Sequence, residues 1–154
     1  MRQLELAAKR VEIAREVFPS ATVVGILFDT TSLEQRDAAV AAARKLGLEP
    51  RMIEVKGERN YGAALDAMGD AHGQPIIVPA GPMFLRDREE IAQALVAHRA
   101  PSIAAFRENT EAGALISYGF DLIGLFSDIA AYVHQIARGA NRRSCRSANP
   151  SAFL

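Results

Sequence analysis

The stretch Thr22–Phe28 reads Thr-Val-Val-Gly-Ile-Leu-Phe, and it decides the fold. It is short, rich in β-branched residues and almost continuously apolar, which is typical of a strand buried on both faces of a parallel sheet. Asp29-Thr30-Thr31-Ser32 follows and supplies side chains that favour the start of a helix. We therefore expect a helix over Ser32–Leu46 that ends at Gly47.

The same alternation continues on both sides of this unit. The further helices are expected over Arg2–Phe18, Asn60–Ala71, Arg86–His98 and Asp121–Ala137. The further strands are expected over Leu48–Val55, Ile76–Val78, Pro101–Ala105 and Ala114–Ser117. Strands that alternate with helices predict an α/β fold. We expect an open, mainly parallel sheet with helices on both faces, as in a flavodoxin-like or Rossmann-like single lobe, followed by a C-terminal helix and an irregular tail.

Length and charge exclude several classes of protein. The 154 residues are enough for one domain with one core. The 18 Lys and Arg equal the 18 Asp and Glu, so the basic excess of a protein that binds nucleic acid is missing. No apolar run approaches the ~20 residues that span a bilayer, and Met1–Arg15 is charged throughout, unlike a secretory signal. The single cysteine, Cys145, excludes an intramolecular disulfide and a zinc cage.

In an open parallel sheet, ligands bind outside the carboxyl ends of the strands. Three of these ends offer suitable groups: hydroxyls at a helix N-terminus, a Gly-Pro turn with two large apolar side chains, and an aromatic beside a guanidinium and a carboxylate. They supply nine candidate ligand-binding residues: Asp29, Thr30, Thr31, Pro82, Met83, Phe84, Phe106, Arg107 and Glu108. A plainer interpretation stays open for each end, namely a helix cap, core packing of Met83 and Phe84, and a surface salt bridge.

Motifs of the common enzyme classes with this topology are missing. Residues 29–34 do not form the G-x-G-x-x-G of a dinucleotide site, and neither G-x-x-x-x-G-K-[ST] nor G-x-S-x-G occurs. His72, His98 and His134 fall on different expected helices, without the i,i+4 spacing of a helical metal pair. We therefore expect a binding protein and not an enzyme, with no catalytic residue, cofactor or metal.

Several short segments follow one another in an order typical of a known family. They are Ala7–Glu12, Phe18–Ala21, Val23–Phe28, Pro82–Phe84, Arg88–Ile91, Pro101–Glu108, Glu111–Gly113, Ser117–Gly119 and Ala131–Ala140. Together they resemble the interlobe stretch and the second lobe of a periplasmic substrate-binding protein, in the tryptophan/tyrosine-type group of ABC transporter components. Two positions near the ligand corner depart from the family pattern. Gly81 stands where the family usually has an acidic residue, and Asn109 where it usually has an aromatic.

The resemblance implies a type I two-lobed fold, of which this chain is a second-lobe fragment. Residues 1–118 would form that lobe, 119–140 a crossover helix that packs on the missing first lobe, and 141–154 an irregular tail. It also implies a small, amino-acid-like ligand clasped between two lobes, an ABC permease as the partner of an intact member, and a periplasmic location. Because no signal peptide is visible, the chain as written would stay in the cytoplasm.

Two other interpretations stay open beside substrate binding. One is an independent flavodoxin-like interaction or regulatory module, and the other is an enzyme of the same sheet type. The expected helix Asp121–Ala137 has an apolar stripe that would lose its partner together with the first lobe. We expect this helix to form a homodimer contact, the alternative being that it folds back on its own sheet.

Overall fold

The computed structural model describes residues 2–57, 60–69, 72–119, 130, 133–134 and 137–138. The chain forms two units, Met1–Phe120 and Asp121–Leu154. The strands and the numbered helices belong to the first unit. Most of the predicted helix over 121–137 and the whole predicted tail over 141–154 lie outside the described residues.

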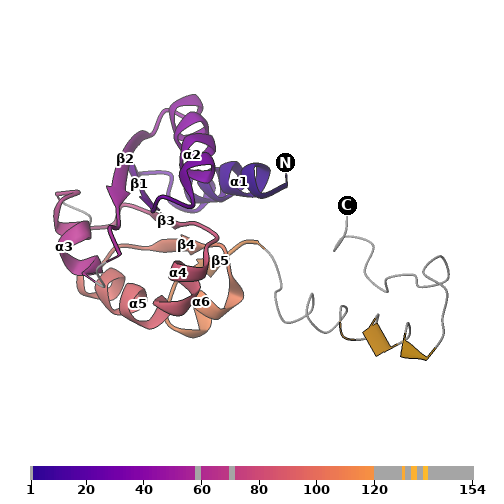
Figure 1. The fold of residues 1–154 in the computed structure, drawn as a ribbon. Helices are drawn as coiled ribbons and strands as arrows, with labels where there is room; N and C mark the ends of the chain where they lie inside the picture. Colours follow the sequence, from indigo (N-terminus) through magenta and orange to yellow (C-terminus); the bar gives the residue numbers. More distant parts are fainter. Residues whose placement is uncertain are drawn as a thin grey trace. The chain divides into compact units, whose positions relative to one another are not determined.

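Within the described part of the first unit, a five-stranded parallel sheet lies at the centre (Figure 1). Its strands are β1 (Val23–Phe28), β2 (Glu49–Glu54), β3 (Ile76–Val78), β4 (Ser102–Ala104) and β5 (Ile116–Ser117). Their order across the sheet is β2-β1-β3-β4-β5. The predicted α/β fold with an open parallel sheet is confirmed.

Helices cover both faces of the sheet (Figure 1). The helices are α1 (Arg2–Val17), α2 (Leu33–Lys45), α3 (Tyr61–Asp66), α4 (Pro82–Arg86), α5 (Arg88–Ala97) and α6 (Arg107–Glu111). α1 and α2 lie on one face, and α3 to α6 lie on the other. None of the helices in the described ranges is both long and apolar enough to cross a membrane.

The outcome for the helices differs from the prediction in three places. α3 ends at Asp66 and not at Ala71, because the chain turns through Gly69, which has a φ of 85°. α5 begins at Arg88, since the preceding residues form α4 instead. α4 and α6 were expected as a turn and a strand end, and each has only five residues. A five-residue helix makes only about one and a half turns, which is too short for apolar residues to recur at helical spacing. The sequence pattern therefore cannot reveal α4 and α6.

The two faces of β1 pack into two separate clusters of buried side chains. Ile26 packs with Val11 of α1 and Ala39 of α2 on one face. Leu27 packs with Phe84 and other side chains from α3 to α5 on the opposite face. Side chains of successive strand residues point to opposite faces, so a strand between two helical layers must be apolar at almost every position. This requirement explains the unbroken apolar run in β1.

Candidate ligand-binding edge

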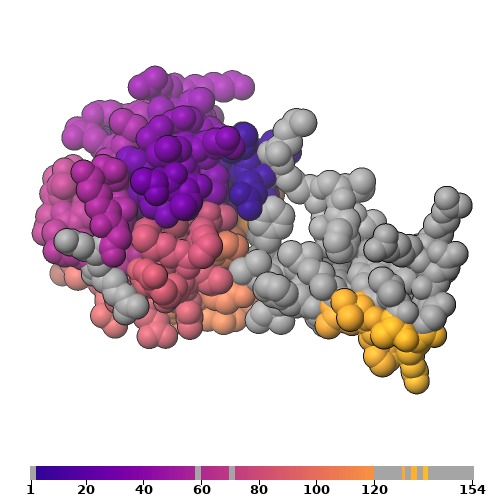
Figure 2. Space-filling view, viewed as in Figure 1, coloured from indigo at the N-terminus to yellow at the C-terminus, as the bar shows by residue number. Residues whose placement is uncertain are grey.

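The three predicted strand ends lie side by side. β1, β3 and β4 are neighbours in the sheet and run in parallel, so the residues that follow them emerge at one edge. We call this set, residues 29–32, 80–84 and 106–109, the carboxyl edge. In the space-filling view, the purple surface around α2 meets the pink surface of α4 and α5 (Figure 2). The topology thus brings together residues that are up to about 80 positions apart in the sequence.

The first part of the carboxyl edge is a turn closed on the Asp29 carboxylate. Its Oδ1 accepts hydrogen bonds from the Thr31 main-chain N at 3.1 Å, the Thr31 hydroxyl at 2.9 Å and the Ser32 hydroxyl at 2.7 Å. Asp29 is buried, whereas Thr30 and Thr31 are exposed. The carboxylate therefore shapes the turn before α2, and Thr30 offers the free side chain of this part.

The second part begins α4. Pro82 occupies the first turn of this helix, where its fixed φ suits the backbone and its missing N–H costs nothing. Pro82 is exposed and Met83 is half-buried, whereas Phe84 is fully buried with Leu27 and Ile91. The Phe84 side chain belongs to the core in this structure, so the surface here consists of Pro82 and Met83.

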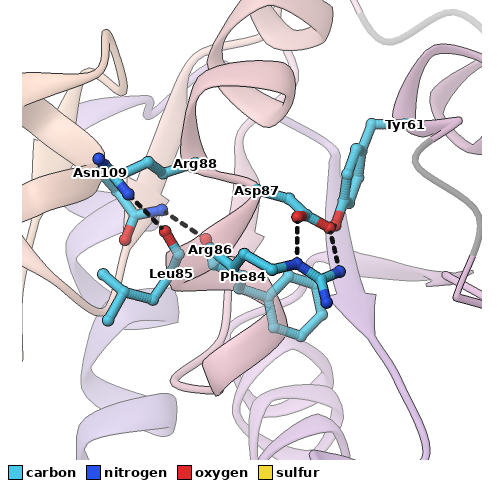
Figure 3. A network of polar contacts seen from close by, with 7 residues as sticks. All are labelled: Tyr61, Phe84, Leu85, Arg86, Asp87, Arg88 and Asn109. Atoms are coloured by element: carbon cyan, nitrogen blue, oxygen red, sulfur yellow. Dashed lines mark hydrogen bonds and ion pairs between the residues drawn. The ribbon is translucent and has the colours of Figure 1, made fainter.

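A buried carboxylate, Asp87, directly follows α4 and links it to Tyr61 of α3 (Figure 3). Its Oδ2 accepts a hydrogen bond from the Tyr61 hydroxyl at 2.9 Å, and Arg86 binds both of its oxygens, through Nε at 2.6 Å and Nη2 at 2.8 Å. Burial, and then the hydrogen bond to Asp87, raise the pKa of the Tyr61 phenol, so it stays a donor. The sequence analysis missed this group, because an Asp between two charged neighbours gives no sign of burial.

The third part begins α6. Phe106 is buried, and Arg107 is exposed and pairs with Glu111 at 3.2 Å. Glu108 is half-buried, and its Oε2 has no hydrogen-bond partner among the described residues. Arg107 and Glu108 are thus the charged groups that this part presents, and Phe106 packs behind them.

Asn109 ties the third part to the second (Figure 3). Its Nδ2 donates to the Phe84 carbonyl oxygen at 3.3 Å, beside Arg88, whose Nη1 donates to the Leu85 carbonyl oxygen at 3.1 Å. Both carbonyls belong to the last turn of α4, where the helix itself offers no donor. Asn109, noted above as a departure from the family pattern, therefore fixes α4 and is itself 2% exposed.

Gln35 ties the first part to the second. Its Nε2 donates to the Ala80 carbonyl oxygen at 2.7 Å, and its Oε1 accepts from the Ala80 main-chain N at 3.0 Å. The second contact of Oε1 is Arg10, whose Nη2 lies 3.4 Å away. The sequence analysis missed both residues, although Arg10 falls between Ala7 and Ala14 on the apolar stripe of α1, which is a recognisable signal.

The first unit has a hollow that lies away from the carboxyl edge. This hollow of about 460 Å³ lies at the amino ends of β4 and β5, and its lining includes Val96, Pro101 and Leu115. None of the nine predicted ligand-binding residues lines it. In the described part of the chain, no cluster of three or more His, Cys, Asp or Glu side chains is arranged to hold a metal ion.

Comparison with known families identifies the chain. The family model described as ABC transporter substrate binding protein matches residues 1–151. The chain belongs to this family. The family resemblance expected from the sequence is confirmed. No curated protein matches this chain.

Solved structures show the same fold. A conserved domain protein from Vibrio cholerae is 19% identical, with a TM-score of 0.73 over 92% of this chain and 48% of its own. An ABC domain in complex with L-Trp from Streptococcus pneumonia is 21% identical, with a TM-score of 0.71 over 88% of this chain and 48% of its own. A ligand-free, open substrate-binding protein with adhesive properties from Clostridium difficile is 20% identical, with a TM-score of 0.64 over 86% of this chain and 46% of its own. The chain therefore spans about half the length of these relatives.

Proposed function

We propose that the chain is one lobe of the substrate-binding component of an ABC import system, and that its carboxyl edge holds a small, amino-acid-like ligand. One observation supports this most: three strand ends carry the predicted residues and are joined by side-chain hydrogen bonds, Gln35 to Ala80 and Asn109 to Phe84. Such ties fix the relative positions of the ligand-facing residues before a ligand arrives, and preorganisation of this kind lowers the cost of binding. The relative that holds L-Trp supports the choice of an amino acid.

The nine predicted residues take three roles in this proposal. Thr30, Thr31, Pro82, Met83 and Arg107 form the surface that the ligand touches, because they are exposed or half-buried. Asp29, Phe84 and Phe106 hold the backbone of this surface in shape, because their side chains are buried. Glu108 is half-buried and supplies negative charge for a positively charged group of the ligand, and its Oε2, a buried atom without a partner among the described residues, must turn outward to accept a hydrogen bond from that group.

A complete member of this kind closes two lobes around its ligand by a hinge motion and delivers it to an ABC permease. The length of the relatives indicates that a second lobe would complete the site. We place the complete protein in the periplasm, in line with its family. A single lobe offers half of the contacts, so we expect it to bind weakly.

A thermal-shift screen of the full chain with aromatic and branched amino acids tests the proposal. Ligand at about 100 times its Kd adds about 2.7 kcal/mol to the free energy of unfolding. Arg107→Ala should abolish the shift, and Arg51→Ala is the matched control, because Arg51 is a comparably exposed arginine that pairs with Glu49 at 2.8 Å on β2. Flat melting curves with every amino acid would favour the independent interaction module.

The homodimer contact through the predicted helix 121–137 stays a prediction. Of this helix, residues 130, 133, 134 and 137 are described, and all four are helical. Val133 is 61% exposed, which fits an apolar stripe that is free to take a partner. Light scattering on the wild type and on Phe126→Asp decides the matter, since a monomeric wild type would contradict the prediction.

A further inference from the structure

Arg10 is a charged side chain buried without a charged partner. It is 1% exposed, and no carboxylate among the described residues lies within salt-bridge distance. Its Nη1 donates to the Tyr118 carbonyl oxygen at 3.1 Å, its Nη2 lies 3.4 Å from Gln35 Oε1, and its Nε has no partner in the described part of the chain. Burial lowers its pKa to about 10. A buried cation held by two neutral acceptors is a costly arrangement, so stability alone is a poor explanation for it.

One neighbour of Arg10 leads to the carboxyl edge. Gln35 holds both main-chain polar groups of Ala80, which directly precedes Gly81 and the start of α4. The same Oε1 atom accepts from Ala80 and faces Arg10. A displacement of the Ala80 backbone must therefore move the amide that Arg10 contacts.

The other neighbour of Arg10 leads to the end of the first unit. The Tyr118 main-chain N donates to the Ala104 carbonyl oxygen at 2.9 Å, directly after β5. The next residue, Gly119, lies so close to the Ala105 carbonyl that a Cβ atom would overlap it. Residues 118–119 are thus firmly seated, and the second unit begins at Asp121. We call residues 118–119 the exit segment.

We propose that Arg10 and Gln35 form a positioning pair that couples the Ala80 turn on the carboxyl edge to the exit segment. The guanidinium has five N–H donors in a rigid fork, so its contact with Gln35 holds the fork in the orientation that also reaches Tyr118, and loss of either contact loosens the other. A ligand seated against Met83 would then change how firmly the chain is held where it leaves the first unit. This last step rests on the proposed function, whereas the coupling itself does not.

Hydrogen exchange of the full chain without ligand tests the coupling. For each variant, the exchange rate is measured at the site that the replaced side chain does not contact, either the Ala80 turn or the exit segment. Gln35 does not contact Tyr118. The Gln35→Met variant should nevertheless speed hydrogen exchange of the Tyr118 amide. Arg10 does not contact Ala80. The Arg10→Met variant should nevertheless speed hydrogen exchange of the Ala80 amide, although Gln35, the partner of that amide, is still present in the variant. We expect the exchange rate to rise about fivefold to tenfold in each case, which corresponds to the net contribution of one ordinary hydrogen bond.

Arg15→Met is the matched control, because Arg15 is another arginine of α1 that donates to two carbonyls, those of Pro19 and Ala21. It should leave the Ala80 and Tyr118 amides unchanged. The Ile76 amide, which donates to Pro101 at the opposite edge, serves as the reference for global unfolding. Equal acceleration at Ile76, or a change confined to the end that each variant touches, would overturn the coupling. If Arg10→Met does not fold, Arg10→Lys replaces it, since Lys keeps the charge and the apolar stem but loses the fork.

A second arm adds L-tryptophan as the probe. The proposal expects slower exchange at Tyr118 in the wild type, and no such change in Gln35→Met. L-Tryptophan that slows exchange near Met83 but leaves Tyr118 unaffected would contradict the coupling. An absence of protection anywhere would count against the proposed function and leave the ligand-free result standing.

Discussion

The Asn109 side chain donates a hydrogen bond to the Phe84 carbonyl oxygen across 3.3 Å, and this bond joins α6 to α4. The two helices follow neighbouring strands, β4 and β3, and have only five residues each. Helices this short do not persist without tertiary contacts. The shape of the candidate site therefore depends on a few buried polar side chains.

Replacement of Asn109 by Ala should lower the free energy of unfolding by about 1–2 kcal/mol, because the carbonyl of Phe84 would lose this buried donor. Urea melts of the wild type and the variant measure the change. Thr110→Ala is a neighbouring control, since the Thr110 hydroxyl is buried without a partner in the described residues and removing it breaks no hydrogen bond. Equal losses in both variants would show that the contact to Phe84 has no special weight.

Removal of the Tyr61 hydroxyl should also destabilise the protein. Tyr61→Phe leaves Asp87 with one donor fewer in a buried position, and we expect a loss of about 1–2 kcal/mol in a urea melt. Tyr118→Phe is the matched control, because Tyr118 is 40% exposed, whereas Tyr61 is 2% exposed. The control should stay within about 0.5 kcal/mol of the wild type. A neutral Tyr61→Phe would mean that the other partners of Asp87, Arg86 among them, satisfy its carboxylate.

Much of the fold could be predicted from the sequence, and much of the site could not. Strands such as Val23–Phe28 are buried on both faces, so their apolar runs are unmistakable. The positions of Asp29, Pro82 and Phe106 followed from the parallel topology alone. Core packing of Phe84 was one of two open interpretations, and the sequence could not decide between them because a five-residue helix leaves no periodic pattern. The burial of Arg10 could be predicted from its place on the apolar stripe of α1, but the main-chain partners of Arg10 and Gln35 could not, because they lie about 110 and 45 positions away in the sequence.

Histidine 98 gives the stability a pH dependence. Its Nδ1 lies 2.7 Å from the Ala94 carbonyl oxygen and its Nε2 lies 2.8 Å from Asp66 Oδ1, so both ring nitrogens face acceptors, an arrangement that favours the doubly protonated ring. The hydrogen bond to Asp66, and then that to Ala94, raise the pKa of His98 above its ordinary value of 6.5. A raised folded-state pKa adds stability that is fully present below pH ~6.5 and is lost as the pH rises through the folded pKa.

Urea melts of the wild type and His98→Gln across the pH range should therefore differ most below pH ~6.5 and converge at higher pH. The difference should be small, because the Asp66 side chain is 74% exposed and water screens the pair. Asp66→Asn removes the carboxylate and should flatten the dependence. A stability gap between wild type and His98→Gln that grows with rising pH would contradict the expected sign.

Packing, and not backbone conformation, leaves little room for a side chain at Gly25, although the crowding atoms are outer side-chain atoms that can shift. A Cβ atom at this position would collide with Ile76 Cδ1 and lie 2.9 Å from Met68 Sδ. Gly25→Ala should cost about 1–3 kcal/mol, the usual range for overpacking a core. Ile76→Val deletes the colliding Cδ1 atom, so the double variant should recover part of the loss. Urea melts of the wild type, the two single variants and the double variant form a double-mutant cycle. If the two losses in free energy of unfolding simply add in the double variant, Ile76 is not the side chain that blocks a Cβ atom at position 25.

A titration of the full chain with L-tryptophan, followed through the backbone amide resonances, tests most directly whether the carboxyl edge binds a ligand. We expect saturable shifts at the amides of Thr30, Thr31, Met83 and Arg107, with the amides of Val96 and Leu115 at the opposite edge unaffected. No saturable shift with any amino acid, or shifts centred on Val96 and Leu115, would contradict the proposed site.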